Sequence, residues 1–128
     1  MSRSGSERGS VAVEMAILLP VLILLLIGTM EFGRALNTQA VLNQAARESV
    51  RVVAISGNTA AGSAKAVASA PTLNPALGPA NITIENCASS ASTTNPSASV
   101  TIRYDLGTLT GLVGPFTISA TAVMLCGG

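Results

Sequence analysis

Few residues of this chain have side chains that could do chemistry. Its 128 residues include no His, which excludes a His-liganded metal site, a Ser-His-Asp triad and a histidine acid–base catalyst. Glu85 and Asp105 fall on separate predicted strands with no second acid near them in the sequence, so a pair of catalytic carboxylates has no support. We therefore expect no enzymatic activity, no cofactor, no metal site and no small-molecule substrate.

Glu14 stands out because of the residues around it. It is the only charged residue between Val11 and Met30. A charged side chain costs on the order of 2.5 to 3.5 kcal/mol at the centre of a bilayer and less near its edge, so Glu14 in a transmembrane helix should have a partner. The alternative is that Glu14 lies at the cytoplasmic interface, where it reaches water and gains from the dipole of the helix N-terminus.

The apolar segment Val11–Met30 predicts one transmembrane helix. At about 1.5 Å per residue it spans roughly 30 Å, the thickness of the hydrocarbon core. A cleaved secretory signal and a buried core helix are the alternatives. The uncharged run Met15–Met30 exceeds the apolar region of a typical signal, and Glu31–Arg34 follows it directly. This pattern favours a retained anchor.

Charge and composition narrow the classes of protein further. Only 10% of the residues are charged, whereas a soluble globular domain has about 25%, which argues against a free cytosolic protein. The net charge of +1 offers no basic stripe for phosphate backbones, so we expect no nucleic-acid partner. Before the apolar segment, Arg3, Arg8 and the α-amine outweigh Glu7, which predicts a cytoplasmic N-terminus.

The helix is expected to continue beyond the membrane. At 100° per residue, apolar side chains gather in an arc of about 120° that leaves the charged residues outside it. Gln39 and Asn43 fall inside this arc. Ser56-Gly57-Asn58 then predicts the end of the helix. The arc consists of Phe32, Ala35, Leu36, Leu42, Ala46, Val50, Val53 and Ala54.

The residues after Gly57 predict a small α+β domain. A short Ala-rich helix is expected over Thr59–Ser69, and three prolines prevent regular structure as far as Ala80. Alternating side chains predict three strands, with linkers 88–96 and 107–115 as exposed loops. The predicted strands are Asn81–Asn86, Ser97–Leu106 and Phe116–Cys126. The predicted inner positions are Ile82 and Ile84; Ala98, Val100, Ile102, Tyr104 and Leu106; and Phe116, Ile118, Ala120, Ala122 and Met124.

A core this small usually needs a further staple, and Cys87 and Cys126 are the candidates. An even pair of cysteines in an extracytoplasmic segment predicts a disulfide, worth roughly 3 to 4 kcal/mol for a loop of about 40 residues. Cys87 is out of phase with Ile82 and Ile84. It therefore lies just past its strand, or a bulge at Asn86 turns it inward. Two buried free thiols are the alternative, and the lack of a CxxC motif argues against a redox-active pair.

The N-terminal sequence contains a distinctive series of residues. They are Arg8, Gly9, Val13 and Glu14, the Leu19-Pro20 pair, the Glu31-Phe32-Gly33-Arg34 segment, and Ala45-Ala46-Arg47-Glu48 continuing to Arg51. Over these roughly 50 residues the chain resembles the TadE-like family of the tight-adherence (Flp) pilus system. Arg8-Gly9-Ser10 followed by Glu14 also resembles a type IV prepilin peptidase site. The pilin proper of this system has Glu followed by Tyr, whereas Glu14-Met15 fits a minor pilin or pseudopilin.

The resemblance implies processing between Gly9 and Ser10, with Glu14 serving peptidase recognition and assembly. The partner of Glu14 would then be the amine created by cleavage, on the same or an adjacent subunit. It also implies an inner-membrane location, and as partners the prepilin peptidase, other pilins or pseudopilins and the pilus assembly platform.

We expect an α+β chain whose long N-terminal transmembrane helix extends into a small antiparallel three-stranded sheet domain. Its parts are a cytoplasmic leader at 1–9, the transmembrane and extended helix at 10–56, and a small extracytoplasmic domain at 57–128. The expected function is that of a TadE-like minor pilin or pseudopilin. The alternative is a single-pass envelope protein whose small domain binds another envelope component.

Overall fold

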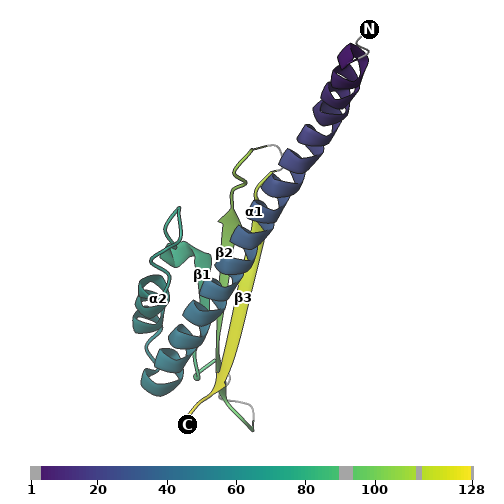
Figure 1. Ribbon diagram of the computed structural model, residues 1–128. Coiled ribbons are helices and arrows are strands. Elements are labelled where there is room, and N and C mark those ends of the chain that lie inside the picture. The colour runs from purple at the N-terminus through teal and green to yellow at the C-terminus, as the bar shows by residue number, and fades with distance from the viewer. Residues whose placement is uncertain (1–3, 90–93, 112–113, 128) are drawn as a thin grey trace. The chain divides into compact units, whose positions relative to one another are not determined.

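The computed structural model describes residues 4–89, 94–111 and 114–127, with side chains from Arg8 onward. Its elements are α1 (Ser4–Ser56), α2 (Thr59–Ala68), a 3-10 helix η1 (Pro79–Asn81), and strands β1 (Ile82–Glu85), β2 (Ser97–Leu106) and β3 (Phe116–Leu125) (Figure 1). The predicted fold class, a long apolar helix leading into a three-stranded antiparallel sheet, is confirmed. The chain divides into an N-terminal unit, Met1–Arg34, and a C-terminal unit, Ala35–Gly128.

Helix α1 begins earlier than the sequence suggested. It starts at Ser4, whereas we placed its start at Ser10. The first three residues of the expected leader lie outside the described residues. Pro20 lies inside the helix without ending it. The end is as predicted: Gly57 has a φ of +67°, and its N–H donates to the carbonyl of Val53 at 2.8 Å, which is how a glycine in the left-handed region closes a helix.

Within the C-terminal unit, one face of α1 is buried against the sheet. The buried face is rotated by roughly 40° from the predicted arc, counting 100° per residue. Phe32 and Leu36 are therefore wrong as buried positions, with 66% and 56% of their surface exposed. The rotation follows from three small or hydroxyl residues that an apolar stripe overlooks: Thr38, Ala45 and Ser49. The buried face is Thr38, Leu42, Ala45, Ala46, Ser49, Val50, Val53 and Ala54.

The sheet has the order β1-β2-β3, and both pairs are antiparallel. All five predicted inner residues of β2 are buried, and Val100 faces Ile84 on one side and Ala122 on the other. On β3, Ile118 and Ala120 are buried, but Phe116 is 38% exposed and was wrongly counted as an inner residue. Phe116 pairs with Leu106 in the last register position of the sheet, where the inner face has ended.

Within the C-terminal unit, helix α2 packs beside β1 (Figure 1). It is capped by Asn58, whose side-chain oxygen accepts a hydrogen bond from the N–H of Ala61 at 3.0 Å. It touches α1 closely, because the hydroxyl of Ser49 donates to the carbonyl of Gly62 at 2.7 Å. A Cβ on Gly62 would lie 2.3 Å from Cγ2 of Val53. Only a residue without a side chain fits there.

The proline-rich connection between α2 and β1 is mostly irregular, as predicted. Its end is an exception, because η1 includes Ala80, and the Asn81 side chain accepts a hydrogen bond from the N–H of Gly78 at 3.2 Å. The hydroxyl of buried Tyr104 donates to the carbonyl of Pro75 at 2.8 Å. This bond ties the connection to the middle strand.

Candidate functional site

The predicted processing residues lie in the first turns of α1. Gly9, Ser10 and Glu14 are all exposed, and the helix passes through them without interruption. Ser10 and Glu14 are four residues apart, which places both on the same helix face, one turn from each other. A Cβ added to Gly9 would meet no atom within 4 Å. The packing of the described chain therefore gives no reason for a glycine at this position.

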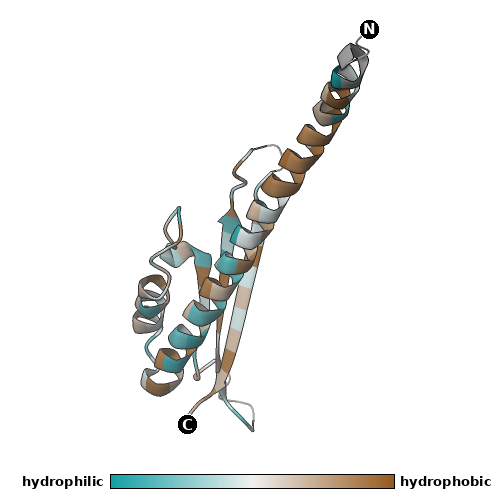
Figure 2. Cartoon of the chain, viewed as in Figure 1, coloured by the Kyte–Doolittle hydropathy of each residue, from teal (hydrophilic) through white to brown (hydrophobic). Residues whose placement is uncertain are grey.

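The segment after Glu14 has the properties of a membrane span. Helix α1 is long and apolar enough to cross a membrane, and its most apolar window, with a mean hydropathy of 2.7, contains no buried residue. In the described residues this window is therefore not buried, as a core helix would be. Figure 2 shows the apolar stretch as a continuous brown band on α1. Beyond it, Nη1 of Arg34 lies 3.6 Å from Oε2 of Glu31.

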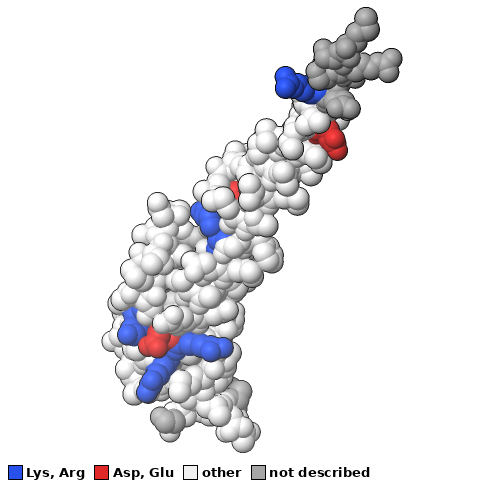
Figure 3. Space-filling view, viewed as in Figure 1, with Lys and Arg blue, Asp and Glu red and all other residues white. Residues whose placement is uncertain are grey.

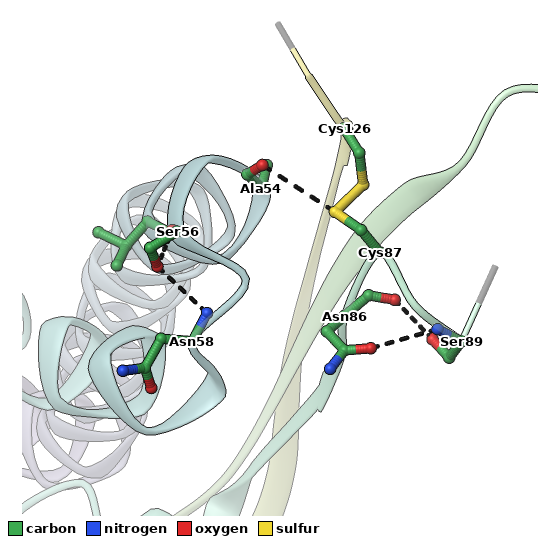
Figure 4. The surroundings of a disulfide bond; sticks show 8 residues. Ala54, Ser56, Asn58, Asn86, Cys87, Ser89 and Cys126 are labelled. Carbon is green, nitrogen blue, oxygen red and sulfur yellow. Dashed lines mark hydrogen bonds between the residues drawn. A yellow bond between two sulfur atoms is a disulfide. The ribbon is translucent and has the colours of Figure 1, made fainter. Parts of the chain in front are cut away.

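The predicted disulfide between Cys87 and Cys126 is present, with a Cα–Cα distance of 6.0 Å (Figure 4). Neither cysteine is free, so the alternative of two free thiols is wrong. Strand β1 ends at Glu85. Of the two explanations for the phase of Cys87, the position past the strand end is therefore the right one.

Local hydrogen bonds place both sulfur atoms. After β1, the N–H of Ser89 donates to both the side-chain oxygen and the carbonyl of Asn86, at 3.2 and 3.1 Å, and its hydroxyl donates to the same carbonyl at 2.6 Å. The N–H of Cys126 donates to the carbonyl of Pro96 at 2.9 Å. Sγ of Cys87 lies 4.0 Å from the carbonyl oxygen of Ala54, a contact without a shared proton, since a disulfide sulfur carries none. The bridge thus joins the two edge strands beside the last turns of α1.

The structure does not bring the predicted residues into one site. Gly9, Ser10 and Glu14 belong to the N-terminal unit, and Cys87 and Cys126 to the C-terminal unit. The first group lies exposed on the first turns of α1. The second stabilises the fold of the sheet, which is a structural role.

Sequence reasoning missed several residues that hold the C-terminal unit together. Gln39 donates from its side-chain nitrogen to the carbonyl of Ser119 at 3.0 Å and to Oδ1 of Asn43 at 3.3 Å. It therefore fixes α1 to the free edge of β3. The signal was present, because Gln39 and Asn43 interrupt the apolar arc at a spacing of four residues. The contact of Ser49 with Gly62 had no comparable signal beyond a glycine in an Ala-rich helix.

Charged side chains gather on one part of the C-terminal unit, while the apolar helix is almost entirely white in Figure 3. Nζ of Lys65 on α2 lies 3.8 Å from Oε2 of Glu48 on α1. On the exposed face of the sheet, Glu85 accepts a hydrogen bond from the hydroxyl of Ser99, and Asp105 from that of Thr117. These two acids belong to different strands, as predicted.

The family model described as TadE-like protein matches residues 9–51, about a third of the chain. Over this segment the chain is similar to TadE-like proteins. No curated protein and no solved structure matches the chain. The TadE-like segment begins at Gly9, contains Glu14 and the apolar stretch, and ends at Arg51 on the helix that packs against the sheet. The disulfide and all three strands lie outside the matched segment, so the family match says nothing about them.

Proposed function

We propose that this protein is a TadE-like minor pilin or pseudopilin that takes part in assembly of a tight-adherence (Flp) pilus. It is anchored in the bacterial inner membrane by α1, with a cytoplasmic N-terminus and an extracytoplasmic C-terminal unit. The observation that carries the proposal is the match of the TadE-like family from Gly9, directly before the membrane-spanning part of α1.

The local geometry supports processing at this place. Cleavage after Gly9 would create an amine on Ser10, one helical turn before Glu14 and on the same face. A carboxylate that is costly in an apolar environment then has a cation within reach, on its own chain or a neighbour. Without cleavage, the chain before Glu14 has no amine at this position.

Two general properties of glycine support Gly9 as the residue before the cleaved bond. A peptidase needs an extended backbone, whereas the described backbone at Gly9 is helical. Glycine in a helix interior is about 1 kcal/mol less favourable than alanine, so the helix opens at lower cost there. The absence of a side chain also lets catalytic groups approach the backbone. Because a Cβ at Gly9 would touch nothing in the chain itself, any need for glycine arises from the peptidase.

The experiment is intact-mass and N-terminal analysis of the protein extracted from membranes of cells with an active prepilin peptidase. The wild-type chain is expected to begin at Ser10. The Gly9→Val variant should keep its leader, while Gly33→Val, another open helical glycine of α1, should be processed normally. A wild-type N-terminus at Met1 or Ser2 would overturn the processed-pilin proposal and favour the alternative of a plain envelope anchor.

A further inference from the structure

The outer face of the sheet, which points away from α1, has apolar side chains at its disulfide end. A sheet face in water normally carries polar residues, and most side chains of this face have hydroxyl groups. Val123 and Leu125 are exceptions, with 64% and 61% of their surface exposed. In the register of the strands, Val123 shares a row with Ser99 and Glu85. We call Glu85, Val123 and Leu125 the sheet patch.

The opposite face of the C-terminal unit is the side of α1 that points away from the sheet. Arg47, Arg51 and Ile55 follow one another at a spacing of four residues, which places them along one line of the helix surface. All three are exposed, Ile55 by 67%. We call these three residues the helix patch. A shallow groove next to it is lined by Glu48, Arg51, Val52, Ile55 and Ser56.

The helix patch is positively charged. Among the described residues, Arg47 and Arg51 make no ion pair. The acid beside them, Glu48, is already paired, because its Oε2 lies 3.8 Å from Nζ of Lys65. Two guanidinium groups on this face are therefore left without a counter-charge.

The sheet patch is negatively charged. Glu85 accepts a hydrogen bond from the neutral hydroxyl of Ser99 at 3.1 Å, and within the described part of the chain it makes no ion pair. Arg103 and Asp105 lie two residues apart on the same face of β2, toward its other end, so their charges offset each other. The outer face of the sheet thus offers one unbalanced acid, and it stands beside exposed apolar side chains.

We propose that the C-terminal units of two copies of this chain stack, with the sheet patch of one copy on the helix patch of the next. Glu85 then faces Arg47 and Arg51, while Val123 and Leu125 cover Ile55 and the groove beside it. Burial of these exposed apolar side chains favours the contact, and the opposite charges set its register. A two-fold contact between like patches is disfavoured, because it would bring Arg51 against Arg51 or Glu85 against Glu85.

The stacked contact has a consequence for assembly. It is heterologous, so each copy keeps one patch free for a further copy. Because the two patches lie on opposite faces of the same unit, a translation across its layers makes the contact. The helices α1 of the two copies then run in the same direction, as two chains anchored in one membrane require. The inference goes beyond the proposed function, since the contact does not depend on cleavage of the leader.

The test uses cross-linking of two different single-cysteine variants. Both native cysteines are in the disulfide, so an introduced cysteine is the only free thiol. Full-length, uncleaved Ile55→Cys and Val123→Cys proteins, with tags of different size, are mixed in detergent micelles and treated with a short bismaleimide. The matched control replaces Val123→Cys with Thr117→Cys, an exposed position on the same face of β3 at its other end.

The mixture of Ile55→Cys and Val123→Cys should give the cross-linked dimer, while Thr117→Cys with Ile55→Cys, and each variant alone, should give little. Adding Glu85→Arg to the Val123→Cys protein should slow cross-linking roughly threefold to tenfold, because an attraction becomes a repulsion. Adding Arg51→Glu to the Ile55→Cys protein as well should restore the rate.

Three results would overturn the stacked contact. One is a yield for Ile55→Cys with Val123→Cys no higher than with Thr117→Cys. Another is equal cross-linking of each variant with itself, which would indicate a two-fold contact. The third is a rate that the two charge reversals, alone or combined, leave unchanged. None of these results bears on cleavage after Gly9, so the proposed function is tested separately.

Discussion

Replacing Gly62 with alanine should destabilise the C-terminal unit, although the change removes a glycine from a helix. By helix propensity alone, alanine would stabilise α2 by about 1 kcal/mol. The added Cβ, however, would lie 2.3 Å from Cγ2 of Val53 and 3.4 Å from both Ile84 Cδ1 and Ser49 Oγ. Either α2 moves away from α1, which stretches the 2.7 Å hydrogen bond from Ser49, or Val53 leaves its position in the core.

The size of the effect follows from these opposing contributions. Overpacking a core typically costs 1 to 3 kcal/mol, and a contact about 1 Å too short belongs in the upper part of that range. After subtraction of the propensity gain, the free energy of unfolding should fall by about 1 to 2 kcal/mol. For a unit of this size, each 1 kcal/mol corresponds to roughly 4 to 8 °C in Tm.

The only tyrosine of the chain supplies the assay. Tyr104 is 3% exposed and lies in the middle strand, so its emission reports unfolding of the C-terminal unit without a contribution from the apolar helix. The measurement uses the full chain in detergent micelles, heated with the disulfide intact. Ala64→Gly, at an exposed position of the same helix, is the control for propensity alone and should cost about 1 kcal/mol.

A second pair of variants tests whether the clash with Val53 causes the loss of stability. In a Val53→Ala variant the clashing methyl group is gone, so Gly62→Ala should there be neutral or stabilising. The reasoning is refuted if Gly62→Ala raises the Tm of the wild-type protein, or if it costs as much in the Val53→Ala background as without it.

Three further predictions concern the staple, the membrane carboxylate and the topology. Replacing Cys87 and Cys126 together with Ser should lower the stability of the C-terminal unit by about 4 kcal/mol, as expected for a 39-residue separation in the chain-entropy model; a loss under about 1 kcal/mol in Tyr104-monitored denaturation would contradict this. Glu14→Ala should leave cleavage before Ser10 intact and slightly improve membrane insertion, while pilus assembly fails; normal surface pili in that strain would remove Glu14 from assembly. A reporter fused after Gly128 should be active only outside the cytoplasm, and activity of a cytoplasmic reporter there would reverse the orientation.

The sequence predicted the elements well because each had a strong periodic signal. The alternation from Ser97 to Leu106 is strict, and β2 has these bounds. The stop of α1 at Gly57 follows from a residue that accepts a positive φ. The disulfide was predictable because two cysteines in a small domain leave few other roles.

The failures have a different origin, since they concern contacts between elements. Ser49 is fully buried, yet a serine in a helix normally indicates an exposed face. Its hydroxyl can be buried because it donates a hydrogen bond to the carbonyl of Gly62. Phe32 was placed in the core because it is large and apolar. The apolar stripe of a helix, however, does not show how far along the helix the sheet extends.

The disulfide also determines how the protein responds to mechanical load. A force applied to the chain after Cys126 passes through the sulfur atoms directly to Cys87, just past the end of β1. The strands β2 and β3 are bypassed and cannot be peeled apart by such a pull. Of the fully extended length that unfolding could release, about 130 Å between the two cysteines stays locked. Tension between α1 and the chain after Cys126 would therefore load the connection from α1 through α2 to β1 first.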